Sequence, residues 1–119
     1  MLFLCYPRCS TCKKAQTWLD QHHIPYTLRD IKTDSPTRDE LALWHQRSGL
    51  PLKKFFNTSG QLYRSMELAK KLPTLSQEEQ LQLLASDGML VKRPLVITDH
   101  RVLVGFREAD WADALPDLS

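Results

Sequence analysis

The sequence predicts an α/β sandwich in which helices pack on a mixed sheet. Two patterns carry this prediction: a β-α-β pattern over residues 2–30, and a β-β-α pattern over residues 95–115. The stretch between them carries helix caps and turn signals but no comparable strand pattern, so it predicts a helical insert. We see no linker, repeat or low-complexity tract, and expect residues 1–119 to form a single domain.

The N-terminal pattern consists of a strand, a helix and a second strand. The apolar run Leu2–Tyr6 stops at Pro7, and a helix-forming run begins near Ser10. The segment Ile24–Asp30 contains the second strand, which should start after Pro25, and a βαβ crossover would make it parallel to the first. Four residues of the helix have the i, i+3, i+4, i+7 spacing of an amphipathic helix: Ala15, Trp18, Leu19 and His22.

Helices are predicted for the middle of the chain. The first should end near Gly49 and the last before Gly88, because glycine often ends a helix. Between them, residues 51–75 contain several breaks, and we expect short helices joined by turns. Two capping boxes mark the helix starts: Thr37 with Glu40, and Ser76 with Glu79.

The C-terminal pattern predicts a hairpin and a last helix. Leu95–Thr98 and Val102–Gly105 are β-rich runs separated by a tight turn. A helix is expected over residues 108–114, with Trp111 and Leu115 buried, and Pro116 should end it. The complete order of elements is that of a thioredoxin-like sandwich.

Composition and charge are those of an ordinary globular protein. The apolar fraction of 42% and the charged fraction of 25% suit a single core, and the net charge of +2 is too small to indicate nucleic-acid binding. No apolar run approaches the length of a membrane span, and Leu2–Tyr6 is too short for a signal peptide. We therefore expect a cytoplasmic protein without membrane attachment.

Cys9 and Cys12 form a Cys-x-x-Cys motif at the start of the predicted first helix. In a reducing compartment such a pair is catalytic or regulatory. The unpaired N–H groups and the positive dipole end of a helix start stabilise a thiolate or a bound oxyanion. We expect Cys9 to be the more exposed thiol, with a lowered pKa, and Cys12 to be its resolving partner.

Other roles for the three cysteines receive less support. A zinc site usually needs four ligands, and the sequence has neither a second Cys pair nor a His-x-x-x-His pattern, so no metal is expected. A structural disulfide between Cys9 and Cys12 would close a very small loop and stabilise little. The two could also be unrelated buried cysteines. Cys5 lies inside an apolar strand and is predicted to be an inert core residue.

Several segments together resemble the arsenate reductase / Spx family, and the resemblance extends over nearly the whole chain. Its most specific feature is the Cys motif followed, about 80 residues later, by Arg93–Pro94 before a strand. The resemblance implies a thioredoxin-like fold and a cis Arg93–Pro94 bond close to the thiol loop. The segments that carry it are Tyr6–Ala15, Phe55–Gly60, Lys92–Ile97 and Val104–Phe106.

The resemblance also implies a chemistry. Arsenate reductases of this family attack arsenate with a cysteine at the position of Cys9, and glutathione with glutaredoxin completes the reduction. Arginines hold the oxyanion, and Arg93 matches one of them, with a planar fork that suits a tetrahedral oxyanion. A second family arginine corresponds to Asn57 here, and a third falls near Phe106 or Arg107.

Residues beside the thiols are further candidates for oxyanion binding. Ser10 and Thr11 are expected to shape the loop and to present backbone N–H groups to an anion. Lys13 and Lys14 could lower the pKa of Cys9 or could be solvated helix residues.

Two functions remain open. The first is a thiol-dependent oxidoreductase without a bound cofactor, which acts on arsenate, another oxyanion or a disulfide and uses glutathione and glutaredoxin, or thioredoxin, as its reductant. The second follows from Cys12, because the reductases of this family often have Ser or Thr at that position. A second cysteine there resembles the redox switch of Spx-type transcription regulators, which bind the RNA polymerase α subunit.

Overall fold

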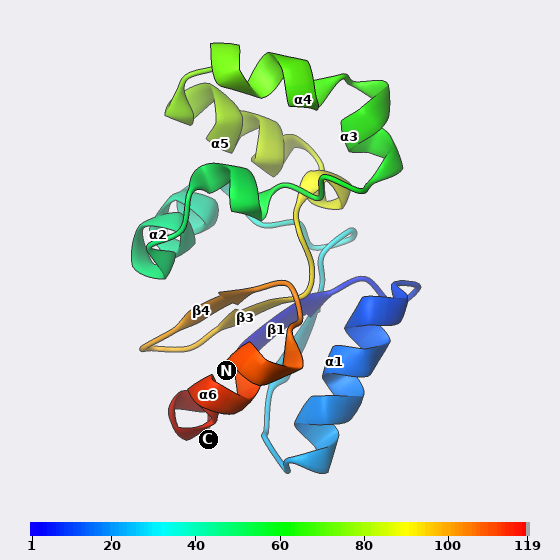
Figure 1. The fold of residues 1–119 in the computed structure, drawn as a ribbon, viewed down its shortest axis with the longest axis vertical. Helices are drawn as coiled ribbons and strands as arrows, with labels where there is room; N and C mark the ends of the chain where they lie inside the picture. Colours follow the sequence, from blue (N-terminus) through cyan, green and yellow to red (C-terminus); the bar gives the residue numbers. More distant parts are fainter. Residues whose placement is uncertain (119) are drawn as a thin grey trace. The chain divides into compact units, whose positions relative to one another are not determined.

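The computed structural model describes residues 1–118, in which two compact units can be distinguished (Figure 1). The first, which we call the sheet unit, consists of residues 1–30 and the C-terminal segment that begins at Arg93. The second, the helical unit, is Ile31–Lys92 and corresponds to the predicted helical insert. That the whole chain behaves as one domain stays a prediction.

Four strands form the sheet of the sheet unit: β1 (Leu2–Cys5), β2 (Thr27–Asp30), β3 (Leu95–Ile97) and β4 (Val102–Val104). Their order is β2-β1-β3-β4. β1 pairs in parallel with β2 and antiparallel with β3, and β4 completes an antiparallel hairpin with β3. The predicted mixed sheet, with its N-terminal crossover and C-terminal hairpin, is therefore confirmed.

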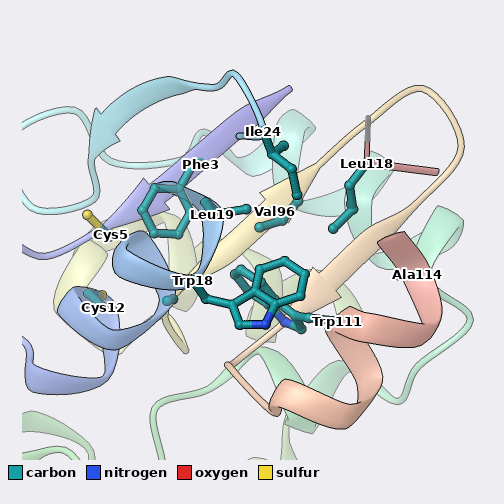
Figure 2. Close-up of a cluster of buried hydrophobic side chains, with 11 residues drawn as sticks. Phe3, Cys5, Cys12, Trp18, Leu19, Ile24, Val96, Trp111, Ala114 and Leu118 are labelled. Carbon is teal, nitrogen blue, oxygen red and sulfur yellow. The ribbon is translucent and has the colours of Figure 1, made fainter. Parts of the chain in front are cut away.

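One face of this sheet packs on two helices, α1 (Ser10–Gln21) and α6 (Glu108–Leu118). Figure 2 shows side chains of both helices gathered on the strand residues Phe3 and Val96, which are register partners. Both strand residues are fully buried. The alternation of side chains along a strand therefore directs one apolar row of the sheet toward α1 and α6.

Two tryptophans join the helices over this face. The rings of Trp18 in α1 and Trp111 in α6 meet edge to face, with centroids 5.7 Å apart, and Trp111 also contacts Phe3 at 6.5 Å. The indole N–H of Trp111 donates to the carbonyl oxygen of Gly105 at 3.1 Å, so burial of this ring leaves no polar group unpaired. This aromatic cluster holds α1 and α6 against the sheet.

The last helix is longer than the sequence predicts. Pro116 lies inside α6, which continues to Leu118, so the prediction that this proline ends the helix is wrong. Leu118 is buried in the core cluster, and the Asp117 carboxylate accepts from Arg101 Nε at 2.8 Å. These contacts hold the last turn in place. Leu115, predicted to be buried, is half-buried beside the core cluster.

Strand β2 begins at Thr27, in agreement with the prediction that it starts after Pro25, and helix α1 ends before it in a Schellman motif. His23 N–H donates to Asp20 O at 3.1 Å, and Ile24 N–H donates to Leu19 O at 3.0 Å. The apolar contact typical of this motif is present, since Ile24 and Leu19 share the core cluster. His23 supplies the left-handed residue, with φ of 55°, where glycine is usual.

The helical unit contains α2 (Arg38–Ser48), α3 (Gln61–Ser65), α4 (Leu68–Lys71), α5 (Gln77–Ser86) and short 3₁₀ turns at Leu52–Phe55, Leu72–Thr74 and Gly88–Leu90. Both predicted capping boxes are present, at Thr37 before α2 and at Ser76 before α5. Gly49 ends α2 in the left-handed conformation, with φ of 69°, as predicted. The guanidinium of Arg38 pairs with Glu78 and ties the start of α2 to the start of α5.

Within residues 1–118, none of the helices is both long and apolar enough to cross a membrane.

The Schellman motif generates a stability prediction. Replacing His23 by glycine should raise the free energy of unfolding by about 0.5–1 kcal/mol. Glycine adopts positive φ without a Cβ penalty, and this gain exceeds the extra conformational entropy that glycine loses on folding. Chemical denaturation of both proteins measures the difference.

Gly49→Ala is the matched control with the opposite sign. A Cβ at Gly49 would meet nothing within 4 Å, so its effect reports backbone strain alone. We expect a loss of about 1 kcal/mol. A loss of stability in His23→Gly would contradict the assignment of strain to His23.

Candidate active site at the start of helix α1

Cys9 is the N-cap residue of α1. Its backbone is extended, with φ of −83° and ψ of 123°, and its carbonyl oxygen accepts the first helical hydrogen bond from Lys13 N–H at 3.1 Å. Side-chain oxygens at this position ordinarily accept from the N–H groups two and three residues further on, which here belong to Thr11 and Cys12. The Cys9 side chain makes no capping hydrogen bond. The N–H groups of Thr11 and Cys12 nevertheless favour its ionised sulfur and lower the pKa of the thiol.

The environment lowers the pKa of the Cys9 thiol. Partial burial raises this pKa and is the largest single influence. The backbone N–H of Cys12, the Cys12 thiol, the Thr11 N–H and the Arg93 guanidinium lower the pKa, and together they outweigh burial. All of these groups donate hydrogen bonds to the thiolate. Cys9 is half-buried, so a reagent in solution can reach it. The expectation of a more exposed thiol with a lowered pKa agrees with this geometry.

Cys12 has the opposite character. It is 2% exposed, and burial raises the pKa of its thiol to about 12, although a hydrogen bond from Tyr6 N–H to Cys12 Sγ at 3.3 Å works against this. The negative charge of Cys9 raises the pKa further. The two sulfurs are close enough to interact, and both are free thiols. One is therefore suited to attack, and the other stays protonated beside it.

Cys5 is buried at the end of β1, as predicted. Burial raises the pKa of its thiol and outweighs the neighbouring Cys12 side chain, which acts to lower it. Figure 2 shows Cys5 and Cys12 in the same core cluster, next to the first turn of α1. A buried thiol of raised pKa is a poor nucleophile, which agrees with the prediction of an inert residue.

Arg93 reaches the site from the segment before β3. The Arg93–Pro94 peptide bond is cis, as the family resemblance implied. The Pro94 carbonyl oxygen accepts from Gly105 N–H at 2.8 Å, which ties this segment to the chain after β4. The Arg93 guanidinium hydrogen-bonds the Cys9 thiolate and lies over the Tyr6 ring, 5.4 Å from its centroid. The structure thus brings Cys9, Cys12 and Arg93 together.

The other predicted oxyanion ligands are more scattered. Ser10 and Thr11 are exposed in the first turn of α1, and Arg107 is exposed before α6, with its Nε 3.8 Å from Asp110 Oδ2. Asn57 belongs to the helical unit, where its N–H donates to Leu90 O at 2.8 Å. Binding of an oxyanion by these residues stays a prediction.

A shallow groove of about 360 Å³ lies beside α1 in the sheet unit. Lys13 and Lys14 line it with apolar and polar neighbours from α1 and the start of α6: Thr17, Trp18, Gln21, Phe106 and Glu108. No group of three or more His, Cys, Asp and Glu side chains in residues 1–118 is arranged to hold a metal ion.

Tyr6 is the site residue that sequence reasoning missed. The sequence predicts it at the end of the first strand, but the structure places it in the loop between β1 and Cys9, in contact with Cys12 and Arg93. Its position directly before Pro7 was the available signal, since a proline separates strand from loop.

Comparison with known proteins agrees with this arrangement. A family model described as the ArsC family matches residues 4–114. The structure of an ArsC-family-related protein from Bacteroides fragilis is 56% identical, with a TM-score of 0.92 and coverage of 94% of either chain. The structure of a possible arsenate reductase from Streptococcus mutans is 46% identical, with a TM-score of 0.85, and covers 93% of this chain and 96% of its own.

Similarity to a regulator is more distant but also extensive. The global transcriptional regulator Spx of Staphylococcus epidermidis is 27% identical over 110 residues, which are 92% of this chain and 82% of the regulator.

The contacts around Cys9 predict that Arg93 affects the pKa of its thiol and that Arg107 does not. Arg93→Ala should raise the pKa of Cys9, because the variant lacks a charged donor to the thiolate, and should slow alkylation by iodoacetamide about tenfold below the midpoint of the pH profile. Arg107→Ala is the control and should leave the profile in place, since 85% of its side chain is exposed.

Mass spectrometry of the Cys9 peptide measures these rates separately from the buried thiols. Equal effects of the two substitutions would contradict the assignment of Arg93 to the thiolate.

Proposed function

Because the chain belongs to the ArsC family, we propose that it is a thiol-dependent oxidoreductase with Cys9 as nucleophile and Cys12 as resolving thiol. One observation carries the proposal: the half-buried Cys9 sulfur lies at the N-cap of α1 with Arg93 beside it, and its pKa is lowered. A nucleophile activated in this way, next to a second thiol, suits chemistry in which two thiols become one disulfide.

The proposed substrate is arsenate or a chemically similar oxyanion, with a disulfide as the other class that a thiolate attacks. With arsenate, the Cys9 thiolate forms a bond to arsenic, and one arsenate oxygen is protonated and leaves as water. The negative oxygens that remain need fixed hydrogen-bond donors. The Arg93 guanidinium and the N–H groups of the first turn of α1 are the donors available at this place.

In the second step another thiol attacks the Cys9 sulfur. The new sulfur–sulfur bond replaces the sulfur–arsenic bond, whose electron pair stays on arsenic, so arsenic(V) becomes arsenic(III) and arsenite leaves. Two thiols and one arsenate thus give one disulfide, one arsenite and one water. If Cys12 is the attacking thiol, the product is a Cys9–Cys12 disulfide.

The ionisation of the two thiols supports this order of events. While Cys9 is a thiolate, its charge helps to keep Cys12 protonated. Once Cys9 is bonded to arsenic, its sulfur no longer carries the negative charge, which lies on the arsenic-bound oxygens held by the Arg93 guanidinium and the N–H groups of α1. Cys12 then has to lose its proton as it attacks the Cys9 sulfur. An external thiol would then reduce the disulfide, with glutathione and glutaredoxin, or thioredoxin, as the proposed reductant.

A redox-sensing regulator is the second candidate, and Cys12 is the residue that favours it. The chain resembles the transcription regulator Spx over most of its length, and a pair of nearby free thiols can act as a switch without any substrate. In this alternative, the Cys9–Cys12 disulfide would alter a surface that binds the RNA polymerase α subunit.

Arsenate-dependent oxidation of NADPH tests the enzyme, coupled in one assay through glutathione and glutaredoxin and in another through thioredoxin. Turnover should fall to background in Cys9→Ser, because an alcohol at this position is not ionised near neutral pH. Cys12→Ser should retain more activity with glutathione than with thioredoxin, since glutathione can attack the Cys9 adduct itself.

Cys5→Ala controls for the loss of any thiol and should remain active. Turnover that survives in Cys9→Ser would refute Cys9 as the nucleophile. Absence of turnover with both reductants would rule out arsenate. Binding of the oxidised and reduced protein to the RNA polymerase α subunit would then test the regulator.

A further inference from the structure

We propose that Tyr6 is the positioning residue of this site, and that its ring holds the Arg93 guanidinium beside the Cys9 sulfur. The inference rests on the proposed role of Cys9 as the reactive thiol. It starts from a convergence of contacts, because Tyr6 meets each of the three residues that the proposed chemistry uses.

Two of these contacts belong to the backbone of Tyr6. Its carbonyl oxygen accepts from Cys9 N–H at 2.9 Å, and its N–H donates to Cys12 Sγ at 3.3 Å. Tyr6 follows directly after β1, so these bonds tie the start of α1 to the end of the central strand. They persist in any variant that keeps the backbone conformation. One of them holds the Cys9 backbone at the helix start, and the other holds the Cys12 sulfur.

The third contact belongs to the side chain. The Arg93 guanidinium carbon lies 5.4 Å from the centroid of the Tyr6 ring, within the range of a cation–π interaction. A guanidinium donates hydrogen bonds from its edge, so an aromatic ring against its face restricts its orientation without using a donor.

This restriction matters because arginine has a long, flexible side chain. Arg93 is half-buried, so packing by itself leaves part of the side chain in solvent. A guanidinium that spends less time beside Cys9 stabilises the thiolate less and meets an incoming oxyanion less often. Tyr6 therefore acts on Cys9 through Arg93. The interaction uses the ring and does not require the hydroxyl.

A double-mutant cycle tests the inference, with the pH profile of Cys9 alkylation as readout. The variants are Tyr6→Leu, Tyr6→Met, Tyr6→Phe, Arg93→Ala and the double variant Tyr6→Leu/Arg93→Ala, each checked for folding by circular dichroism. Both substitutions that remove the ring should slow alkylation about threefold below the midpoint of the profile, which is the size of one partly exposed cation–π contact. Tyr6→Phe should match the wild type.

The cycle separates positioning from a structural role. In the Arg93→Ala background, Tyr6→Leu should have no further effect, because the group that Tyr6 holds is gone. A full additive effect in that background would overturn the inference, as would equal slowing by Tyr6→Phe and Tyr6→Leu. Unchanged rates in folded Tyr6→Leu and Tyr6→Met would also overturn it. Alkylation needs no substrate, so the cycle tests the role of Tyr6 even if the protein does not reduce arsenate.

Discussion

The site depends on one constraint: the unpaired N–H groups at the start of α1 are held against the sulfur of Cys9. A helix start supplies this effect only where the helix is fixed, and α1 is fixed by the apolar face that it presents to β1 and α6. Trp18 and Trp111 meet over Phe3, and the Trp111 indole is satisfied by Gly105 O. The hydrophobic core therefore sets the electrostatics of a thiol at the edge of that core.

Position alone makes two chemically identical groups different. Cys9 and Cys12 are three residues apart, but one is the half-buried N-cap and the other lies on the buried face of the first turn. Hydrogen bonds lower the pKa of the first against the effect of burial, whereas burial dominates the second. Pairs of titratable groups whose environments push their pKa values apart are typical of catalytic sites. The same pair would serve a redox switch equally well.

Local rules predicted most of the fold, and tertiary packing explains the exceptions. Capping boxes at Thr37 and Ser76 and a glycine stop at Gly49 depend on neighbouring residues, so the sequence was sufficient for them. Pro116 continues its helix because Leu118 is anchored in the core, which no local pattern reveals. At the site, the motif and the family resemblance predicted Cys9, Cys12 and Arg93. Tyr6 escaped prediction because its ring contacts Arg93, which is distant in the sequence.

The ultraviolet absorbance of thiolates tests the central claim most directly. The reduced protein is titrated from acid to alkaline pH, together with Cys5→Ser, Cys9→Ser and Cys12→Ser. The account predicts that the first thiolate to form belongs to Cys9, so the earliest absorbance step should be missing in Cys9→Ser and present in the other two variants. An earliest step that survives in Cys9→Ser would contradict it.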